Sequence, residues 1–214
     1  MVTRVLSKLD QLVAMCDDGL RTVFGPTPPA GRENPGNKAP EAALDPHERV
    51  LSGRLIRVDH AGEVCAQAIY QGQAATARLS HVRDTMRQAA AEENDHLAWT
   101  ATRLGELGSH PSYLNPVWYV GSFAIGALAG LIGDKWSLGF VAETERQVVA
   151  HLDDHLQRLP EADQKSHEIL EQMREDEGHH ATVAIEAGAA SLPIAVKRLM
   201  RFTSRIMTRT AYWI

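Results

Sequence analysis

The sequence predicts an all-α protein, a four-helix bundle with one further helix before it and one after it in the chain. Four long stretches carry apolar residues at helical spacing, and glycine or proline follows three of them. Runs of β-branched residues are few, and no Asn-Gly pair marks a tight hairpin. With 214 residues, of which 44% are hydrophobic, the chain is long enough to form one well-packed core.

The first 47 residues are expected to lie outside the bundle. Residues 2–24 form an amphipathic pattern in which Val5, Leu9 and Leu12 recur at helical spacing. Residues 25–46 include six prolines, a composition typical of a linker and not of a core element. We therefore divide the chain into an N-terminal helix and linker, residues 1–47, and a bundle domain, residues 48–214.

The bundle helices are long and follow one another with short connections. We expect them at residues 48–80, 82–107, 123–158 and 162–188. Pro160 ends the third helix and Pro193 closes the segment after the fourth. Four helices of this length are what an up-and-down bundle requires.

Residues 111–133 contain no charged side chain and are long enough to cross a bilayer. Pro111, Pro116 and several glycines interrupt this stretch. Aromatic residues bracket it as they do at a membrane interface: Tyr113, Trp118, Tyr119 and Trp136. The pattern leaves three alternatives, namely a segment at the membrane interface, a segment buried against the bundle and a true membrane span.

The last helix, expected at residues 193–212, is strongly basic. The chain has a formal net charge of −5, yet every charged residue after Glu186 is basic, so the preceding part carries −10. The five basic residues of the last segment share one helical face, opposite an apolar one: Lys197, Arg198, Arg201, Arg205 and Arg209. Such a helix is typical of contact with an anionic membrane, and docking against the bundle or a partner protein is the alternative. The acidic remainder argues against binding of nucleic acid.

Two Glu-x-x-His motifs stand on predicted helices at matching distances from two further glutamates. The side chains at the two ends of each motif lie about 60° apart on one helix face, within reach of one metal ion. Each motif follows a lone glutamate by 30 or 32 residues, about the length of a helix–turn–helix that returns the chain to the same level. The candidate ligands are Glu63, Glu93, His96, Glu145, Glu177 and His180.

This set of four carboxylates and two imidazoles is that of ferritin-like di-metal bundles, and it is suited to two iron ions. Glu145 is preferred to Glu143 because it completes the matched interval. The alternative is that these acids lie on solvated helix faces. We expect no catalytic side chain beyond the metal ligands.

Several neighbouring residues are candidates for supporting roles. Acidic side chains that can accept a hydrogen bond from a ligating histidine are Asp59, Asp95 and Asp176. His151 and His155 lie beyond Glu145 on the same helix and are expected to be supporting or surface residues.

Four segments together resemble the demethoxyubiquinone hydroxylases of ubiquinone biosynthesis. They are Val58-Asp59-His60-Ala61-Gly62-Glu63, Glu92-Glu93-Asn94-Asp95-His96-Leu97, Glu143-Thr144-Glu145 and Asp176-Glu177-Gly178-His179-His180. The resemblance covers residues 48–214 and implies a di-iron monooxygenase of the ferritin-like superfamily, with the same six residues as iron ligands. The one departure is at Glu143-Thr144-Glu145, where some relatives have paired glutamates.

The resemblance also implies the substrates and the location. The enzyme would use O2 to hydroxylate the ring of a polyprenylated methoxy-methyl-benzoquinol. Because such a substrate lies in the bilayer, we expect a peripheral membrane protein at the cytoplasmic face of the bacterial inner membrane. An external electron donor is expected since the chain has no glycine-rich dinucleotide motif, and proteins of a quinone-biosynthesis complex are further candidate partners.

Two other functions fit the same ligands. One is a ferritin- or rubrerythrin-like protein that oxidises iron or scavenges peroxide. The absence of Cys-x-x-Cys pairs argues against a rubrerythrin, and the apolar stretch and basic tail argue against a soluble storage cage. The other is a metal-stabilised, non-catalytic membrane scaffold.

Overall fold

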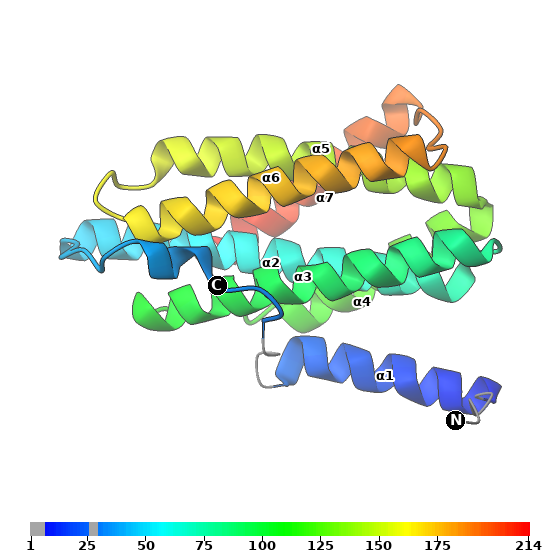
Figure 1. Cartoon of the computed structure of the whole chain (residues 1–214), viewed down its shortest axis with the longest axis horizontal. Helices are drawn as coiled ribbons and strands as arrows, with labels where there is room; N and C mark the ends of the chain where they lie inside the picture. The colour runs from blue at the N-terminus through cyan, green and yellow to red at the C-terminus, as the bar shows by residue number, and fades with distance from the viewer. Residues whose placement is uncertain (1–6, 26–29) are drawn as a thin grey trace.

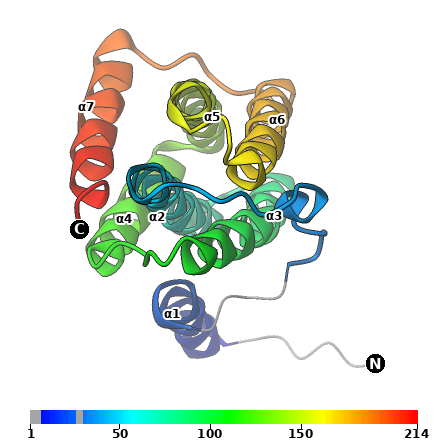
Figure 2. The ribbon, with the colours of Figure 1, turned by 90° about the vertical axis from the view of Figure 1, so that its left-hand side faces the viewer.

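The computed structural model describes residues 7–25 and 30–214 and contains no strand within these ranges. Four helices lie side by side as a bundle (Figures 1 and 2). They are α2 (Pro46–Thr76), α3 (Ser80–Glu106), α5 (Asp134–Arg158) and α6 (Gln164–Glu186). The prediction of an all-α bundle is confirmed.

The bundle consists of two helical hairpins, α2–α3 and α5–α6, joined by a crossover helix. That helix is α4 (Asn115–Ile132), which runs back along the outside of α2 (Figure 1). Gly72 and Gly126 allow the two helices to approach closely, since a Cβ atom on Gly126 would lie 2.3 Å from the carbonyl oxygen of Ile69. The crossover brings α5 to the same end of the bundle at which α3 begins.

The prediction of one helix over residues 123–158 is wrong. Gly133 has a φ of 138° and ends α4, and α5 begins at the next residue. Asp134 accepts hydrogen bonds from the backbone N–H groups of Arg78 and Leu79, at 3.0 and 2.8 Å. Asp134, the first residue after the break, therefore supplies a hydrogen-bond acceptor to the backbone just before α3. The prediction of one continuous helix did not include this contact.

The linker is more structured than its composition predicted. It contains a short 3₁₀ helix, η1 (Pro35–Lys38), in which Pro35 and Gly36 are buried, and Leu44 belongs to the main core. The expectation that residues 25–46 contain no core element is therefore wrong. The preceding helix, α1 (Lys8–Phe24), begins with a capping box at Ser7, and the expected start at residue 2 lies outside the described residues.

Two apolar clusters fill the bundle, one toward each end. The main core cluster includes Leu55, Trp99, Leu152 and Met173, from all four bundle helices. The second cluster combines several alanines with larger side chains such as Tyr70, Met86 and Leu138. The polar groups described below lie between the two clusters.

The uncharged stretch lies against the bundle on one side and is exposed on the other. Residues Gly126, Ala129 and Gly130 of α4 are buried, whereas apolar side chains point outward from it: Val117, Val120, Leu128 and Leu131. Among the described residues, α4 is the one helix with the length and hydropathy to cross a membrane. The last helix, α7 (Ile194–Ala211), packs on the outside of α2 (Figure 2). Most of its apolar side chains are exposed.

Candidate metal centre

The six residues selected by their spacing meet in the middle of the bundle. Glu63 comes from α2, Glu93 and His96 from α3, Glu145 from α5, and Glu177 and His180 from α6. All six are buried. The two Glu-x-x-His motifs bring their side chains to the same level because both helices present that face to the centre of the bundle.

The Nδ1 atom of each histidine faces the carboxylates. For His96 this atom lies 3.1 Å from Glu93, 3.2 Å from Glu177 and 3.5 Å from Glu63. For His180 it lies 3.3 Å from Glu177 and 3.4 Å from Glu93. Glu93 and Glu177 therefore lie between the two imidazoles.

Glu145 completes the cluster, and Glu143 lies elsewhere. Tyr70 donates a hydrogen bond of 2.5 Å to Glu145 Oε1, and Glu145 also interacts with Glu177. Glu143 instead forms an ion pair of 3.0 Å with Lys197, on α7. The structure thus brings together the residue that the interval favoured and leaves the alternative outside.

The electrostatics of the cluster favour a bound cation. Burial, followed by the charge of Glu93, raises the pKa of Glu63 well above its usual value, and burial and the charge of Glu177 do the same for Glu145. The oxygens Glu63 Oε2, Glu93 Oε1 and Glu145 Oε2 are buried and have no hydrogen-bond donor among the described residues. Buried carboxylate oxygens without donors are costly unless a cation binds them, so the residues fit a metal centre.

The acidic residue that precedes each Glu-x-x-His motif contacts the histidine of the other motif. Asp176 Oδ2 lies 2.9 Å from His96 Nε2, and Glu92 Oε2 lies 2.7 Å from His180 Nε2. Asp176 was an expected partner of a ligating histidine. Glu92 was not, although its place directly before Glu93 is the signal that could have identified it.

Asp95 and Asp59 do not have the expected role. Asp95 accepts hydrogen bonds from the backbone N–H of Gly31, at 2.6 Å, and from Arg32, at 2.7 Å. Arg32 also binds Asp176 at 2.8 Å. The linker is therefore attached to the surroundings of His96, a connection between residues 63 or more positions apart that no local pattern reveals. Asp59 contacts other histidines, described below.

Two hollows border the cluster. One is an apolar cavity of about 410 Å³ between α2, α4, α5 and α7, whose wall includes Glu63, Trp118, Phe140 and Met207. The other, on the opposite side and of about 650 Å³, is more open and is lined by polar side chains that include Glu92, Asp176 and His180. The buried cluster thus borders an apolar hollow at Glu63 and a polar hollow at His180.

Comparison with known proteins gives a consistent result. Residues 51–211 match the family described as Ubiquinone biosynthesis protein COQ7. A 3-demethoxyubiquinol 3-hydroxylase of Nitrosococcus oceani is 59% identical over 214 residues, which cover both chains completely. Two further proteins of the same name are also similar. The one from Nitrosospira multiformis is 56% identical over 209 residues, which cover 98% of this chain and 100% of the relative. The one from Legionella pneumophila strain Paris is 55% identical over 212 residues, which cover 99% of this chain and 100% of the relative.

Proposed function

The chain belongs to the COQ7 family of ubiquinone biosynthesis proteins, and on this premise we propose that it hydroxylates the ring of 3-demethoxyubiquinol with O2. The observation that carries the proposal is the buried cluster of four glutamates and two histidines, which opens onto an apolar cavity at Glu63. This combination suits a reaction between O2 and an apolar, ring-bearing substrate. The many full-length relatives with this enzyme name support the same conclusion.

The proposed cofactor is a pair of iron ions. Four carboxylates balance the charge of two divalent ions, and His96 and His180 place one imidazole on each side of Glu93 and Glu177. The proposed ligands are Glu63, Glu93, His96, Glu145, Glu177 and His180. When bound, iron supplies the electrons that activate O2.

The chain's own residues orient the ligands and exclude water. Glu92 and Asp176 fix the ring orientation of His180 and His96, which keeps each Nδ1 atom directed at the carboxylates. Tyr70 fixes Glu145 through its hydroxyl group. The apolar side chains of the cavity surround the quinol ring and keep it beside Glu63.

The proposed location is the cytoplasmic face of the bacterial inner membrane. The cavity is bordered by α4 and α7, and both helices carry exposed apolar residues on the outside of the bundle. A polyprenyl tail can pass between these helices into the bilayer while the ring stays in the cavity. The proposal includes an external electron donor, because the chain contains no dinucleotide motif. Proteins of a quinone-biosynthesis complex are further proposed partners.

The test is hydroxylation by the purified, iron-loaded protein, supplied with reductant, O2 and 3-demethoxyubiquinol. We expect the wild type to form the hydroxylated quinol and Glu177→Ala to lose both the activity and bound iron. Glu175→Ala is the matched control, since Glu175 is exposed on the same helix. Full activity with less than one iron ion per chain would contradict the mechanism.

A deletion strain distinguishes the hydroxylase from the two alternatives. A hydroxylase predicts accumulation of the demethoxy precursor, which wild-type protein relieves and the Glu177→Ala variant does not. A storage protein predicts normal quinone levels in the deletion strain. A scaffold predicts that a folded Glu177→Ala variant restores the quinone.

A further inference from the structure

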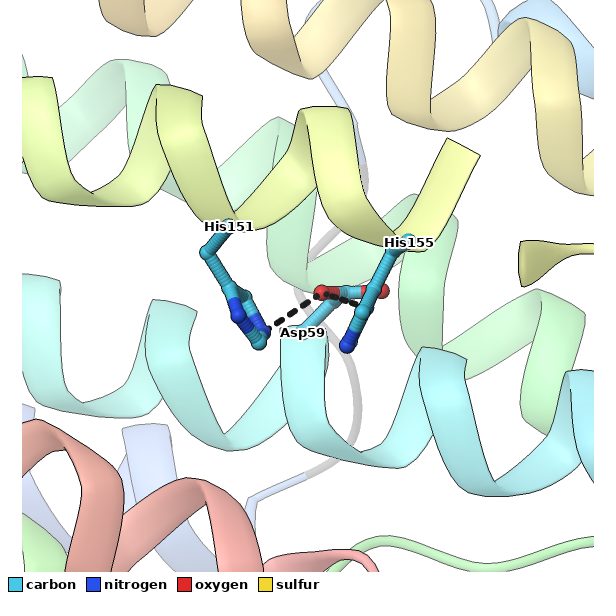
Figure 3. A group of neighbouring side chains, drawn as sticks. All are labelled: Asp59, His151 and His155. Atoms are coloured by element: carbon cyan, nitrogen blue, oxygen red, sulfur yellow. Dashed lines mark ion pairs between the residues drawn. The ribbon is translucent and has the colours of Figure 1, made fainter. Parts of the chain in front are cut away.

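A second group of metal-binding side chains lies outside the carboxylate cluster. Asp59 comes from α2, and His151 and His155 stand one turn apart on α5 (Figure 3). Asp59 Oδ1 is 2.8 Å from His155 Nδ1 and 3.6 Å from His151 Nε2. In Figure 3 the Asp59 carboxylate lies beside both imidazole rings, and one donor atom from each residue lies within 4.8 Å of the others.

The polar atoms of this group lack hydrogen-bond partners. Both oxygens of Asp59, Nε2 of His151 and Nδ1 of His155 are buried and have none among the described residues. Asp59 and His155 are only 3% and 2% exposed. Apart from the two ion pairs with Asp59 Oδ1, these four buried polar atoms have no partner among the described residues, and they are close enough together to hold one ion between them.

A divalent cation is a partner that suits these donor atoms. Carboxylate oxygens and imidazole nitrogens are ligands that divalent transition metals take from proteins. A metal ion at this place would bind the Asp59 carboxylate and one ring nitrogen of each histidine.

We propose that Asp59, His151 and His155 bind one divalent transition-metal ion, with zinc as the ion that fits best. Two histidines at positions i and i+4 of a helix, together with a carboxylate, are a common zinc donor set. Three protein ligands leave one coordination position open, as in zinc sites that bind a further oxygen ligand. Zinc also binds more tightly than ferrous iron to a given set of nitrogen and oxygen donors.

The proposed site borders the apolar cavity. Asp59 and His151 both line the cavity wall, and Asp59 lies one helical turn before Glu63 on α2. A metal ion at this place would therefore bind a water molecule or an oxygen atom of a cavity ligand. The proposal does not depend on the iron assignment, because the two sites share no ligand.

The experiment is a zinc titration of the iron-loaded, full-length protein by equilibrium dialysis, with both metals quantified by mass spectrometry. We expect one zinc ion per chain with no loss of iron, and a zinc absorption-edge spectrum that shows imidazole nitrogen ligands. Asp59→Asn and His155→Ala are expected to lose this zinc. His47→Ala is the matched control, since His47 is exposed and distant in sequence from the site, and it should bind zinc as the wild type does.

Three results would overturn the proposal. They are an iron-loaded protein that takes up no zinc, zinc uptake that releases an equal amount of iron, and equal zinc binding by the folded Asp59→Asn variant. Asp59→Asn preserves the shape of the side chain, so it decides the question even if His155→Ala does not fold. Iron content and hydroxylation are measured separately on zinc-free protein, so a failure of the zinc site is distinguishable from a failure of the proposed hydroxylase.

Discussion

Each Glu-x-x-His motif is preceded by an acidic residue that serves the opposite motif. Glu92 on α3 contacts His180 on α6, and Asp176 on α6 contacts His96 on α3. Each of these two helices therefore supplies the acidic partner for the histidine of the other. Although burial opposes its ionisation, hydrogen bonds with His96 and Arg32 lower the pKa of Asp176. Asp176 is therefore an anion at neutral pH, and it fixes the ring that faces the carboxylates.

We predict that Asp176→Asn weakens iron binding by about 10- to 100-fold, the usual effect of removing a carboxylate that orients a metal-binding histidine. The amide has no negative charge to hold His96 Nε2 or Arg32. The measurement is the loss of iron to a chelator over time, compared between variant and wild type. Glu175→Gln is the control, since Glu175 is exposed and lies one residue earlier, and this variant should retain iron as the wild type does. If Asp176→Asn also retained iron as the wild type does, Asp176 would not orient His96.

At the scale of elements, the position of α4 depends on close contact with α2. A Cβ atom on Gly126 would lie 2.3 Å from the carbonyl oxygen and 2.8 Å from the Cα atom of Ile69. These are backbone atoms, which cannot move aside as a flexible side chain can. The wall of the cavity therefore depends on glycine at this position.

We predict that Gly126→Ala lowers the free energy of unfolding by about 1–3 kcal/mol, because α4 must move away from α2. The measurement is denaturant-induced unfolding of the iron-loaded protein. Gly121→Ala is the control, since Gly121 is exposed on α4 and nothing lies within 4 Å of an added Cβ atom. That change should raise the free energy of unfolding by up to about 1 kcal/mol through helix propensity; equal effects of the two changes would argue against the close contact.

At the scale of the whole molecule, the face formed by α4 and α7 differs from the rest of the surface. It combines exposed apolar residues with basic side chains on an otherwise acidic protein: Val120, Leu128, Leu199, Phe202, Arg201 and Arg205. Lys197 is the basic residue whose ion pair, with Glu143, attaches α7 to α5. The same face borders the cavity, which is where a membrane-borne substrate would enter.

We predict that the double change Arg201→Ala and Arg205→Ala weakens binding to anionic vesicles by about 30-fold, since each basic residue near such a surface contributes about 1 kcal/mol. The measurement is flotation with vesicles at physiological salt. The matched control is Arg21→Ala with Arg87→Ala, which removes two exposed arginines from α1 and α3. The control should bind like the wild type, and equal loss in both variants would mean that overall charge, and not this face, determines binding.

The bundle and the six clustered residues could be predicted because their signals are local. Helical periodicity, prolines and each Glu-x-x-His motif can be read within a few turns of the chain, and the intervals of 30 and 32 residues add Glu63 and Glu145. The structure places α2, α3 and α6 within four residues of their expected ends. The break at Gly133 was missed because a single glycine does not show from the sequence whether a helix continues through it, even though the charged residues Asp134 and Lys135 follow directly. Only the positive φ of this glycine separates α4 from α5.

The sequence alone determined the all-α class, three of the four bundle helices and which acidic and histidine side chains belong together, because each of these depends on spacing along the chain. The tertiary structure alone decided how Arg32 of the linker reaches Asp176, how α4 and α7 enclose a cavity beside Glu63, and how Asp59 meets His151 and His155. These are contacts between residues far apart in the chain. Their geometry follows from how the helices pack, and no local pattern encodes it.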